Sequence, residues 1–224
     1  MCLDGEQFEL TLKNLQYKLN IRINPIYSLY MIVKGYLNTL LRSKRTVFTF
    51  RELMMLWNDV SVQTALSRVH YYVKNNQLYQ IRKGIYAKDK NYDVFELATK
   101  IFRPSYISFE TVLGMEGVIF QKYNTAFLAS YQTKEISCDI HKFTFKKLKD
   151  SILLNNSGII NKDDIMIATK ERAFLDVIYL NKDYYFDNLI SLDFDKVFKL
   201  LEIYENKRLE TDVKKLYESN KTNI

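Results

Sequence analysis

Residues 49–88 read TFRELMMLWNDVSVQTALSRVHYYVKNNQLYQIRKGIYAK, and this stretch decides the fold of the first half of the chain. Thr49 is a suitable N-cap for a helix that begins at Phe50, and Glu52 stands in its first turn, where an acidic side chain suits the helix dipole. The apolar residues recur at helical spacing, at Leu53, Leu56 and Trp57. A short amphipathic helix is therefore predicted, and Asn58-Asp59 ends it.

A second, longer helix is predicted to start after Ser61, which is a fresh N-cap. On a helical wheel its apolar side carries Val62, Ala65, Leu66, Val69 and Val73. Its opposite side offers amide, hydroxyl and basic groups without a carboxylate, at Gln63, Thr64, Ser67, Arg68, Tyr71, Lys74 and Asn75. Such groups read base edges and phosphates, whereas an ordinary solvated helix face usually mixes Glu and Asp with Lys.

A β-hairpin is predicted after this helix, because residues 78–87 show an alternating pattern of side chains that is typical of β-strands. Gly84 supplies a turn position where φ can be positive. Arg82 and Lys83 would stand at the tip of the hairpin. A short helix, a turn, a longer helix and a basic hairpin follow each other in a winged helix-turn-helix. The sequence therefore predicts a domain that binds double-stranded DNA.

Each side chain of this surface has an expected role in DNA binding. Thr64, Ser67 and Arg68 would meet bases, with Gln63 at the start of the same face. Phosphates and groove walls would be held by Tyr71, Lys74, Arg82 and Lys83. Arg51, on the preceding helix, completes the predicted DNA-binding set.

The charge of the chain is distributed unevenly. The 224 residues carry a net charge of +7, with 47% hydrophobic and 26% charged residues, which is typical of a soluble globular protein. Residues 1–90 hold 14 Lys/Arg and 6 Asp/Glu, a net of +8, whereas residues 91–224 hold 19 and 20, a net of −1. The positive excess lies in the half with the predicted DNA-binding helices, and it points to nucleic acid or an anionic surface as the partner of that half.

Two domains are predicted, with the polar segment Lys88-Asp89-Lys90-Asn91 as the boundary. Residues 1–90 would contain an amphipathic helix over 4–20 and a second over 28–43, the latter being the first core helix of the winged domain. Residues 91–224 read as an α+β domain with a helical end. Its expected elements are helices over 92–102, 109–115 and 170–180, strands over 126–129, 140–145 and 165–168, and two final helices about 195–205 and 209–218.

No membrane, metal or cofactor is predicted. No apolar run approaches the roughly 20 residues of a membrane span, and the start of the chain lacks the pattern of a signal peptide. Cys2 and Cys138 have no metal-like spacing, and His70 and His141 have no carboxylate at ligand spacing. The chain is therefore expected to be cytoplasmic, with reduced thiols.

In order and spacing, three motifs of this chain resemble those of the AbiEi family, the antitoxins of type IV toxin–antitoxin and abortive-infection systems of phage defence. The motifs are the helix-turn-helix followed by Ile81-Arg82-Lys83-Gly84-Ile85-Tyr86-Ala87, then Tyr106-Ile107-Ser108-Phe109-Glu110, and then residues 167–176. The sequence departs from the family at Glu116, where a histidine is usual, and at Arg172, where a lysine is usual.

The resemblance implies an autorepressor that binds its own promoter, with repeated operator sites, and a C-terminal domain that neutralises a nucleotidyltransferase-like toxin. The partners implied are thus double-stranded DNA and the cognate toxin. For the C-terminal domain we interpret its densest charged set as the antitoxicity or partner surface, formed by Lys170, Glu171, Arg172 and Asp176. The alternative reading of this set is a surface ion pair between Arg172 and Asp176.

Two other functions are alternatives to this one. An enzyme acting on nucleotides would use Asp193-Phe194-Asp195 as a metal-binding pair, but the upstream residues 187–191 lack the glycine of a phosphate-binding turn. The two aspartates more simply start a helix, so no catalytic residue is predicted and the chain is not expected to be an enzyme. A one-component winged-helix regulator would instead bind a small ligand in the second domain.

Overall fold

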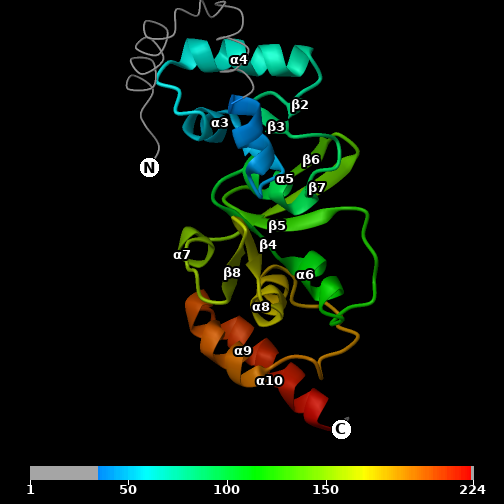
Figure 1. The fold of residues 1–224 in the computed structure, drawn as a ribbon. Helices are drawn as coiled ribbons and strands as arrows, with labels where there is room; N and C mark the ends of the chain where they lie inside the picture. Colours follow the sequence, from blue (N-terminus) through cyan, green and yellow to red (C-terminus); the bar gives the residue numbers. More distant parts are fainter. Residues whose placement is uncertain (1–34, 223–224) are drawn as a thin grey trace, which may run out of the picture.

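The chain has a mixed α+β fold with two β-sheets, as the sequence predicted, in a computed structural model that describes residues 35–222 (Figure 1). The predicted helix over 4–20 and the first part of the helix predicted over 28–43 lie outside the described residues. Helix α4 lies at one end of the molecule, and helices α9 and α10 lie toward the other (Figure 1). No helix within residues 35–222 combines the length and apolar composition needed to cross a membrane.

The N-terminal part, residues 35–90, contains the predicted pair of helices and the predicted hairpin. After a helix over 35–42 its elements are β1 (Val47–Thr49), α3 (Phe50–Leu56), α4 (Val62–Lys74), β2 (Tyr79–Arg82) and β3 (Ile85–Ala87). The three strands form an antiparallel sheet in the order β1-β3-β2. Strand β1 was not predicted, because three residues are too few to show an alternating pattern.

Local chemistry explains where these elements start and turn. The Thr49 hydroxyl accepts a hydrogen bond from the backbone N–H of Glu52, and the Glu52 carboxylate accepts one from the N–H of Thr49, at 3.2 and 2.8 Å. This capping box starts α3, and the Ser61 hydroxyl caps α4. Gly84, at φ +82°, occupies the left-handed turn position between β2 and β3 that the sequence assigned to it.

The C-terminal part, residues 91–222, is built around a mixed six-stranded sheet in the order β6-β7-β5-β4-β9-β8. Its strands are β4 (Ser105–Ile107), β5 (Ala126–Ser130), β6 (Lys134–Cys138), β7 (His141–Lys147), β8 (Ile159–Lys162) and β9 (Ile165–Ala168). Its helices are α5 (Val94–Ile101), α6 (Phe109–Met115), α7 (Asp150–Leu153), α8 (Lys170–Leu180), α9 (Phe194–Leu201), the 3-10 turn η1 (Glu202–Tyr204) and α10 (Lys207–Thr222).

The sheet is covered by helices. Helix α5 contacts β4, β5 and β9 and also β1 of the N-terminal part, while α6 packs on α8 and α8 packs on α9 and α10. The predicted helices over 92–102, 109–115 and 170–180 are confirmed, and so are the predicted strands at β5, β7 and β9. The sequence missed β4, β6 and β8, which are short or carry exposed polar residues.

The two parts share one hydrophobic core across the predicted boundary at 88–91. Val47 and Ala87 of the N-terminal sheet belong to the same buried cluster as Leu97 and Ala98 of α5. A second, smaller cluster lies inside the N-terminal part around Trp57 and Tyr72. The polar segment 88–91 therefore marks a change of structure along the chain, but apolar packing continues beneath it.

A network of charged side chains reinforces this junction. The carboxylate of Glu96 in α5 accepts hydrogen bonds from the backbone N–H groups of Thr46 and Val47, at 2.7 and 3.1 Å. Lys100, one turn further on, lies 3.5 Å from Glu96 and 3.0 Å from Glu52 of α3. Its side chain is only 1% exposed, so the ammonium group is held between two carboxylates from different parts of the chain.

Acid is expected to weaken the fold through Glu52. Burial, the largest single influence, raises the pKa of Glu52, but hydrogen bonds from the Thr49 backbone, Lys100 and Arg103 outweigh it and lower the pKa from 4.5 to about 2. A lowered pKa contributes stability that is present above pH 4.5 and is lost as pH falls toward 2. The contribution is on the order of 1–3 kcal/mol, because solvent screening at this partly exposed site reduces it below the full value of the shift.

Urea unfolding at several pH values measures this effect. Glu52→Gln should be less stable than the wild type at pH 6, and the difference should shrink as pH falls through 4 toward 2.5. The exposed residue Glu116 provides the control, since Glu116→Gln should follow the wild-type curve at every pH. A difference between Glu52→Gln and the wild type that stays constant over this range would contradict the assignment.

Candidate nucleic-acid interface

Helix α4 presents a polar outer face whose orientation follows from its buried residues. Ala65, Val69 and Tyr72 are buried, and together they define the inner side of the helix. The residues on the opposite side of the helix follow one another at intervals of three or four positions. All of them are exposed: Gln63, Ser67, His70 and Lys74. Thr64 and the half-exposed Tyr71 flank this row. We call these six residues the α4 face, and it contains no carboxylate.

The structure corrects the predicted position of the apolar side of α4. Val62 and Leu66, expected to be buried, are 56% and 44% exposed. Tyr72 is buried in their place, between Trp57 and Tyr71, with ring centroids 5.6 and 5.7 Å away. Tyr72 was not predicted to be buried, because Val62 and Leu66 are more hydrophobic and were assigned to the inner side instead. That assignment rotated the predicted buried side of the helix away from Tyr72. The correct orientation brings His70 into the exposed row.

Arg68 does not lie on the α4 face, so the expected base contact from this side chain is wrong in this geometry. Its guanidinium group pairs with Asp59 in the turn between α3 and α4, and the side chain is only 14% exposed. The same group lies 3.7 Å from the ring centroid of Tyr36 and 5.5 Å from that of Trp57. Arg68 therefore holds α4 against the α3–α4 turn through its ion pair, and against Tyr36 and Trp57 through cation–π contacts.

The β2–β3 hairpin carries the other predicted basic residues. Arg82 and Lys83 are both exposed at its turn, directly before Gly84. The base of the hairpin is anchored to the C-terminal part, because Tyr79 stacks on Tyr92 at a centroid distance of 6.4 Å. The hairpin therefore packs on the C-terminal part at its base and presents two exposed basic side chains at its tip.

Two of the three acidic residues of the N-terminal part are held in ion pairs. Residues 35–90 contain three, Glu52, Asp59 and Asp89. Glu52 is paired with Lys100 and Arg103, and Asp59 is paired with Arg68. The exposed basic residues of the same part are therefore left largely without carboxylates beside them; they include Arg42, Lys44, Arg51, Lys74, Arg82 and Lys83.

The predicted antitoxicity surface on helix α8 is wrong for three of its four residues. Arg172 and Asp176 are 0% exposed and Glu171 is 4% exposed, whereas Lys170 alone is partly exposed. The same burial excludes the alternative of a surface ion pair. Helix α8 is covered by α6, α9 and α10, so its charged side chains point into the core.

Arg172 and Asp176 instead form the centre of a buried polar cluster. The Asp176 carboxylate accepts hydrogen bonds from the hydroxyls of Ser108, Tyr106 and Tyr204, at 2.7, 3.0 and 2.6 Å. Arg172 Nε lies 3.5 Å from Asp176, and its terminal nitrogens donate to the backbone carbonyls of Ile152 and Ser157, at 2.7 and 2.9 Å. Burial raises the pKa of Tyr106 and Tyr204, so both phenols remain donors.

The Asp193-Phe194-Asp195 sequence starts helix α9, as the simpler of its two readings predicted. Asp193 is the N-cap, and its carboxylate accepts a hydrogen bond from the N–H of Lys196 at 3.2 Å. Lys196 Nζ also lies 3.1 Å from the same carboxylate. Across the part of the chain that the structure covers, no three His, Cys, Asp or Glu side chains gather as a metal site would require.

Neither a protein-family model nor a curated protein matches this chain. The resemblance to the AbiEi family therefore rests on the three sequence motifs alone. The structure gives each of the three motifs a defined position. Ile81–Ala87 covers the end of β2, the turn and β3, and the segment from Tyr106 supplies two hydroxyls to the buried cluster around Asp176. Residues 167–176 join the end of β9 to α8 and supply Arg172 and Asp176 to the same cluster.

Proposed function

We propose that the chain is a DNA-binding transcriptional regulator with a winged helix-turn-helix, in which α3 and α4 are the paired helices and β2–β3 is the wing. The observation that carries the proposal is the α4 face, which is exposed, polar and free of carboxylates, and α4 is followed in the chain by a hairpin with an exposed basic tip. A helix fits the major groove of B-DNA, and a basic hairpin next to it reaches the phosphates.

The roles of individual residues follow from their chemistry and position. Gln63, in the first turn of α4, can pair with adenine through its amide, and Ser67 can donate to or accept from a base edge. Lys74 at the end of α4 and Lys83 in the wing would neutralise phosphates, with Tyr71 against the groove wall. Arg68 takes a different role from the one expected, because it orients α4 from behind.

The resemblance to the AbiEi family extends the proposal to the antitoxin of a type IV pair, which represses its own promoter and neutralises a nucleotidyltransferase-like toxin. A toxin-neutralising surface would lie outside the Arg172–Asp176 cluster, since that cluster is buried. Reversing the charge of Arg172 would therefore disrupt the core. If a nucleotidyltransferase gene adjoins the gene for this chain, its co-expression with the full chain tests this extension, and growth should be restored.

DNA binding is tested by fluorescence anisotropy with the DNA upstream of the protein's own gene and with a scrambled duplex of equal length. The logarithm of affinity should fall linearly with the logarithm of salt concentration on both duplexes. Gln63→Ala should weaken binding to the upstream DNA by about 1–3 kcal/mol and affect the scrambled duplex little. Lys83→Ala should weaken both and reduce the salt slope by about one.

Lys214→Ala is the matched control for Lys83→Ala. It removes the same charge from an exposed position on α10, at the opposite end of the molecule from α4 (Figure 1). Equal losses for Lys83→Ala and Lys214→Ala would mean that binding follows net charge alone. Equal affinity of the wild type for the upstream and scrambled duplexes would overturn the repressor proposal.

A further inference from the structure

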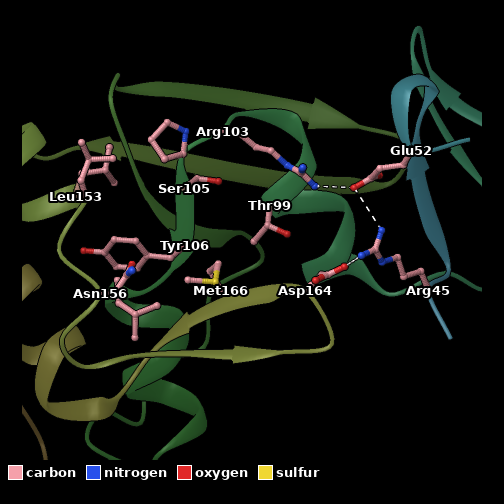
Figure 2. Close-up of a pocket in the computed structure, with 13 residues that line it drawn as sticks. Arg45, Glu52, Thr99, Arg103, Ser105, Tyr106, Leu153, Asn156, Asp164 and Met166 are labelled. Atoms are coloured by element: carbon pink, nitrogen blue, oxygen red, sulfur yellow. Dashed lines mark hydrogen bonds and ion pairs between the residues drawn. The ribbon is translucent and has the colours of Figure 1, made fainter. Parts of the chain in front are cut away.

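A cavity of about 560 Å³ opens where the N-terminal and C-terminal parts meet (Figure 2). Its walls come from α3, from the end of α5 with the following segment into β4, from the chain after α7, and from the β8–β9 hairpin. The volume falls within the range of roughly 300–1,000 Å³ that is typical of small-molecule sites. The cavity has two ends with different chemistry.

One end of the cavity is charged, with both signs present. Arg103 Nη2 lies 2.9 Å from a carboxylate oxygen of Glu52, and Arg45 lies 3.8 Å from the same oxygen and also pairs with Asp164 (Figure 2). The side chains of Arg103 and Asp164 are 56% and 41% exposed, so their charged groups are accessible to a ligand. Among residues 35–222, Glu52 is the one ion-pair partner of Arg103, which leaves most of its five N–H donors available.

The other end of the cavity is largely apolar. Tyr106, Leu153 and Met166 line it, and in Figure 2 they lie apart from the Arg45–Glu52–Arg103 group. The Asn156 side chain stands beside Tyr106 and provides an amide at the rim (Figure 2). Tyr106 is held in place from behind, because its hydroxyl is hydrogen-bonded to Asp176 in the buried cluster. Tyr106 and Leu153 are almost fully buried, so the accessible apolar surface at this end comes from the more exposed Leu154, Ile159 and Met166.

The balance of charge at the first end selects the kind of ligand. Arg45 and Arg103 contribute two positive charges, and Glu52 and Asp164 contribute two negative charges. A simple anion would meet the two carboxylates and a simple cation would meet the two guanidinium groups. A zwitterion can place its anionic group on a guanidinium and its cationic group on a carboxylate, so that every charge keeps an opposite partner.

We propose that this cavity binds a free α-amino acid with a large apolar side chain. The α-carboxylate would lie against Arg103, and the α-ammonium group against Asp164. The side chain would extend toward Leu154, Ile159 and Met166.

Binding at this site would reach the N-terminal part through Glu52. Glu52 belongs to α3, the helix that directly precedes α4, and it also holds Lys100 and Arg103 of the C-terminal part. A ligand carboxylate that engages Arg103 competes with Glu52 for that group. A consequence for DNA affinity rests on the proposed function, whereas ligand binding itself does not, so the two are measured separately.

The test is isothermal titration calorimetry of the full chain with three probes of similar shape. L-Phenylalanine carries both charges, 3-phenylpropanoate lacks the ammonium group, and phenethylamine lacks the carboxylate. L-Phenylalanine should bind at least tenfold more tightly than either of the others. L-Leucine and L-methionine should also bind, and glycine should not, because it has no side chain for the apolar end.

Variants locate the binding within the cavity. Arg103→Gln and Asp164→Asn should each weaken binding of L-phenylalanine at least tenfold, and Arg82→Gln in the wing, the matched control, should leave it unchanged. Thermal unfolding establishes that each variant is folded, and Asp164 is exposed enough that its variant keeps the fold. The proposal is overturned if 3-phenylpropanoate binds as tightly as L-phenylalanine, if Asp164→Asn has no effect, or if none of the large apolar amino acids binds at millimolar concentration.

Discussion

Asp176→Asn is expected to lower the free energy of unfolding by about 3–5 kcal/mol, because it leaves the buried Arg172 guanidinium without its counter-charge. Both side chains are 0% exposed, so water cannot replace the lost partner. The substitution keeps the shape of the side chain, which separates the loss of charge from the loss of packing. It also disturbs the hydrogen bonds that Tyr106, Ser108 and Tyr204 donate to this carboxylate.

A second Arg–Asp pair provides a matched control for this prediction. Arg208 and Asp212 in α10 have the same i,i+4 spacing, but their side chains are 40% and 24% exposed. Asp212→Asn should cost less than about 1 kcal/mol, as exposed pairs usually do. Urea unfolding followed by circular dichroism at pH 7 measures both variants.

The size of the loss also reports the ionisation of Asp176. Burial raises the pKa of Asp176, and Arg172 with the three hydroxyl donors opposes that rise. A loss below about 1 kcal/mol for Asp176→Asn would mean that the group is already neutral in the fold, since a neutral acid and an amide then differ little. That outcome would contradict the ion pair.

Elements whose signals are local could be predicted from the sequence. Thr49 and Ser61 cap α3 and α4, and Gly84 turns the hairpin, because each depends on residues at most a few positions away. The α+β class and most helix positions follow from the same kind of signal. The α4 face was mostly predicted too, since Gln63, Thr64, Ser67, Tyr71 and Lys74 are exposed.

Charged residues with distant partners were misread. Arg172 and Asp176 stand one helical turn apart, which in a sequence looks like a surface pair. Their burial depends on Tyr106, which is 70 residues from Asp176, and on Tyr204, which is 28 residues away. Arg68 was misread for the same reason, because its pairing with Asp59 and stacking on Tyr36 are set by tertiary packing. Spacing along one helix contains no information about either.

The connection between the two parts was also hidden from the sequence. The polar segment 88–91 and the jump in net charge suggested two independent cores. The structure instead packs Val47 and Ala87 with Leu97 and Ala98, and it places Lys100 between Glu52 and Glu96. A fragment of residues 1–90 would lack Glu96, whose carboxylate accepts hydrogen bonds from the N–H groups of Thr46 and Val47. These two N–H groups would lose that partner in the fragment.

Lys100→Met is expected to destabilise the whole molecule by about 3–5 kcal/mol, because it leaves the buried carboxylate of Glu96 without a positive partner. Methionine fills a similar volume, so the loss reports the charge rather than a cavity. Lys199→Met is the matched control, since Lys199 also stands in the last turn of a helix but is exposed. It should change the free energy of unfolding by no more than about 0.5 kcal/mol.

The shape of the unfolding transition shows whether the two parts unfold together. If both parts depend on one core and on Lys100, Lys100→Met should shift a single cooperative transition that is followed equally by Trp57 fluorescence and by circular dichroism. Trp57 lies in the N-terminal cluster, so its fluorescence reports that part specifically. Two separate transitions, with the Trp57 signal unchanged by Lys100→Met, would instead establish that residues 1–90 fold independently and that the junction only joins two finished domains.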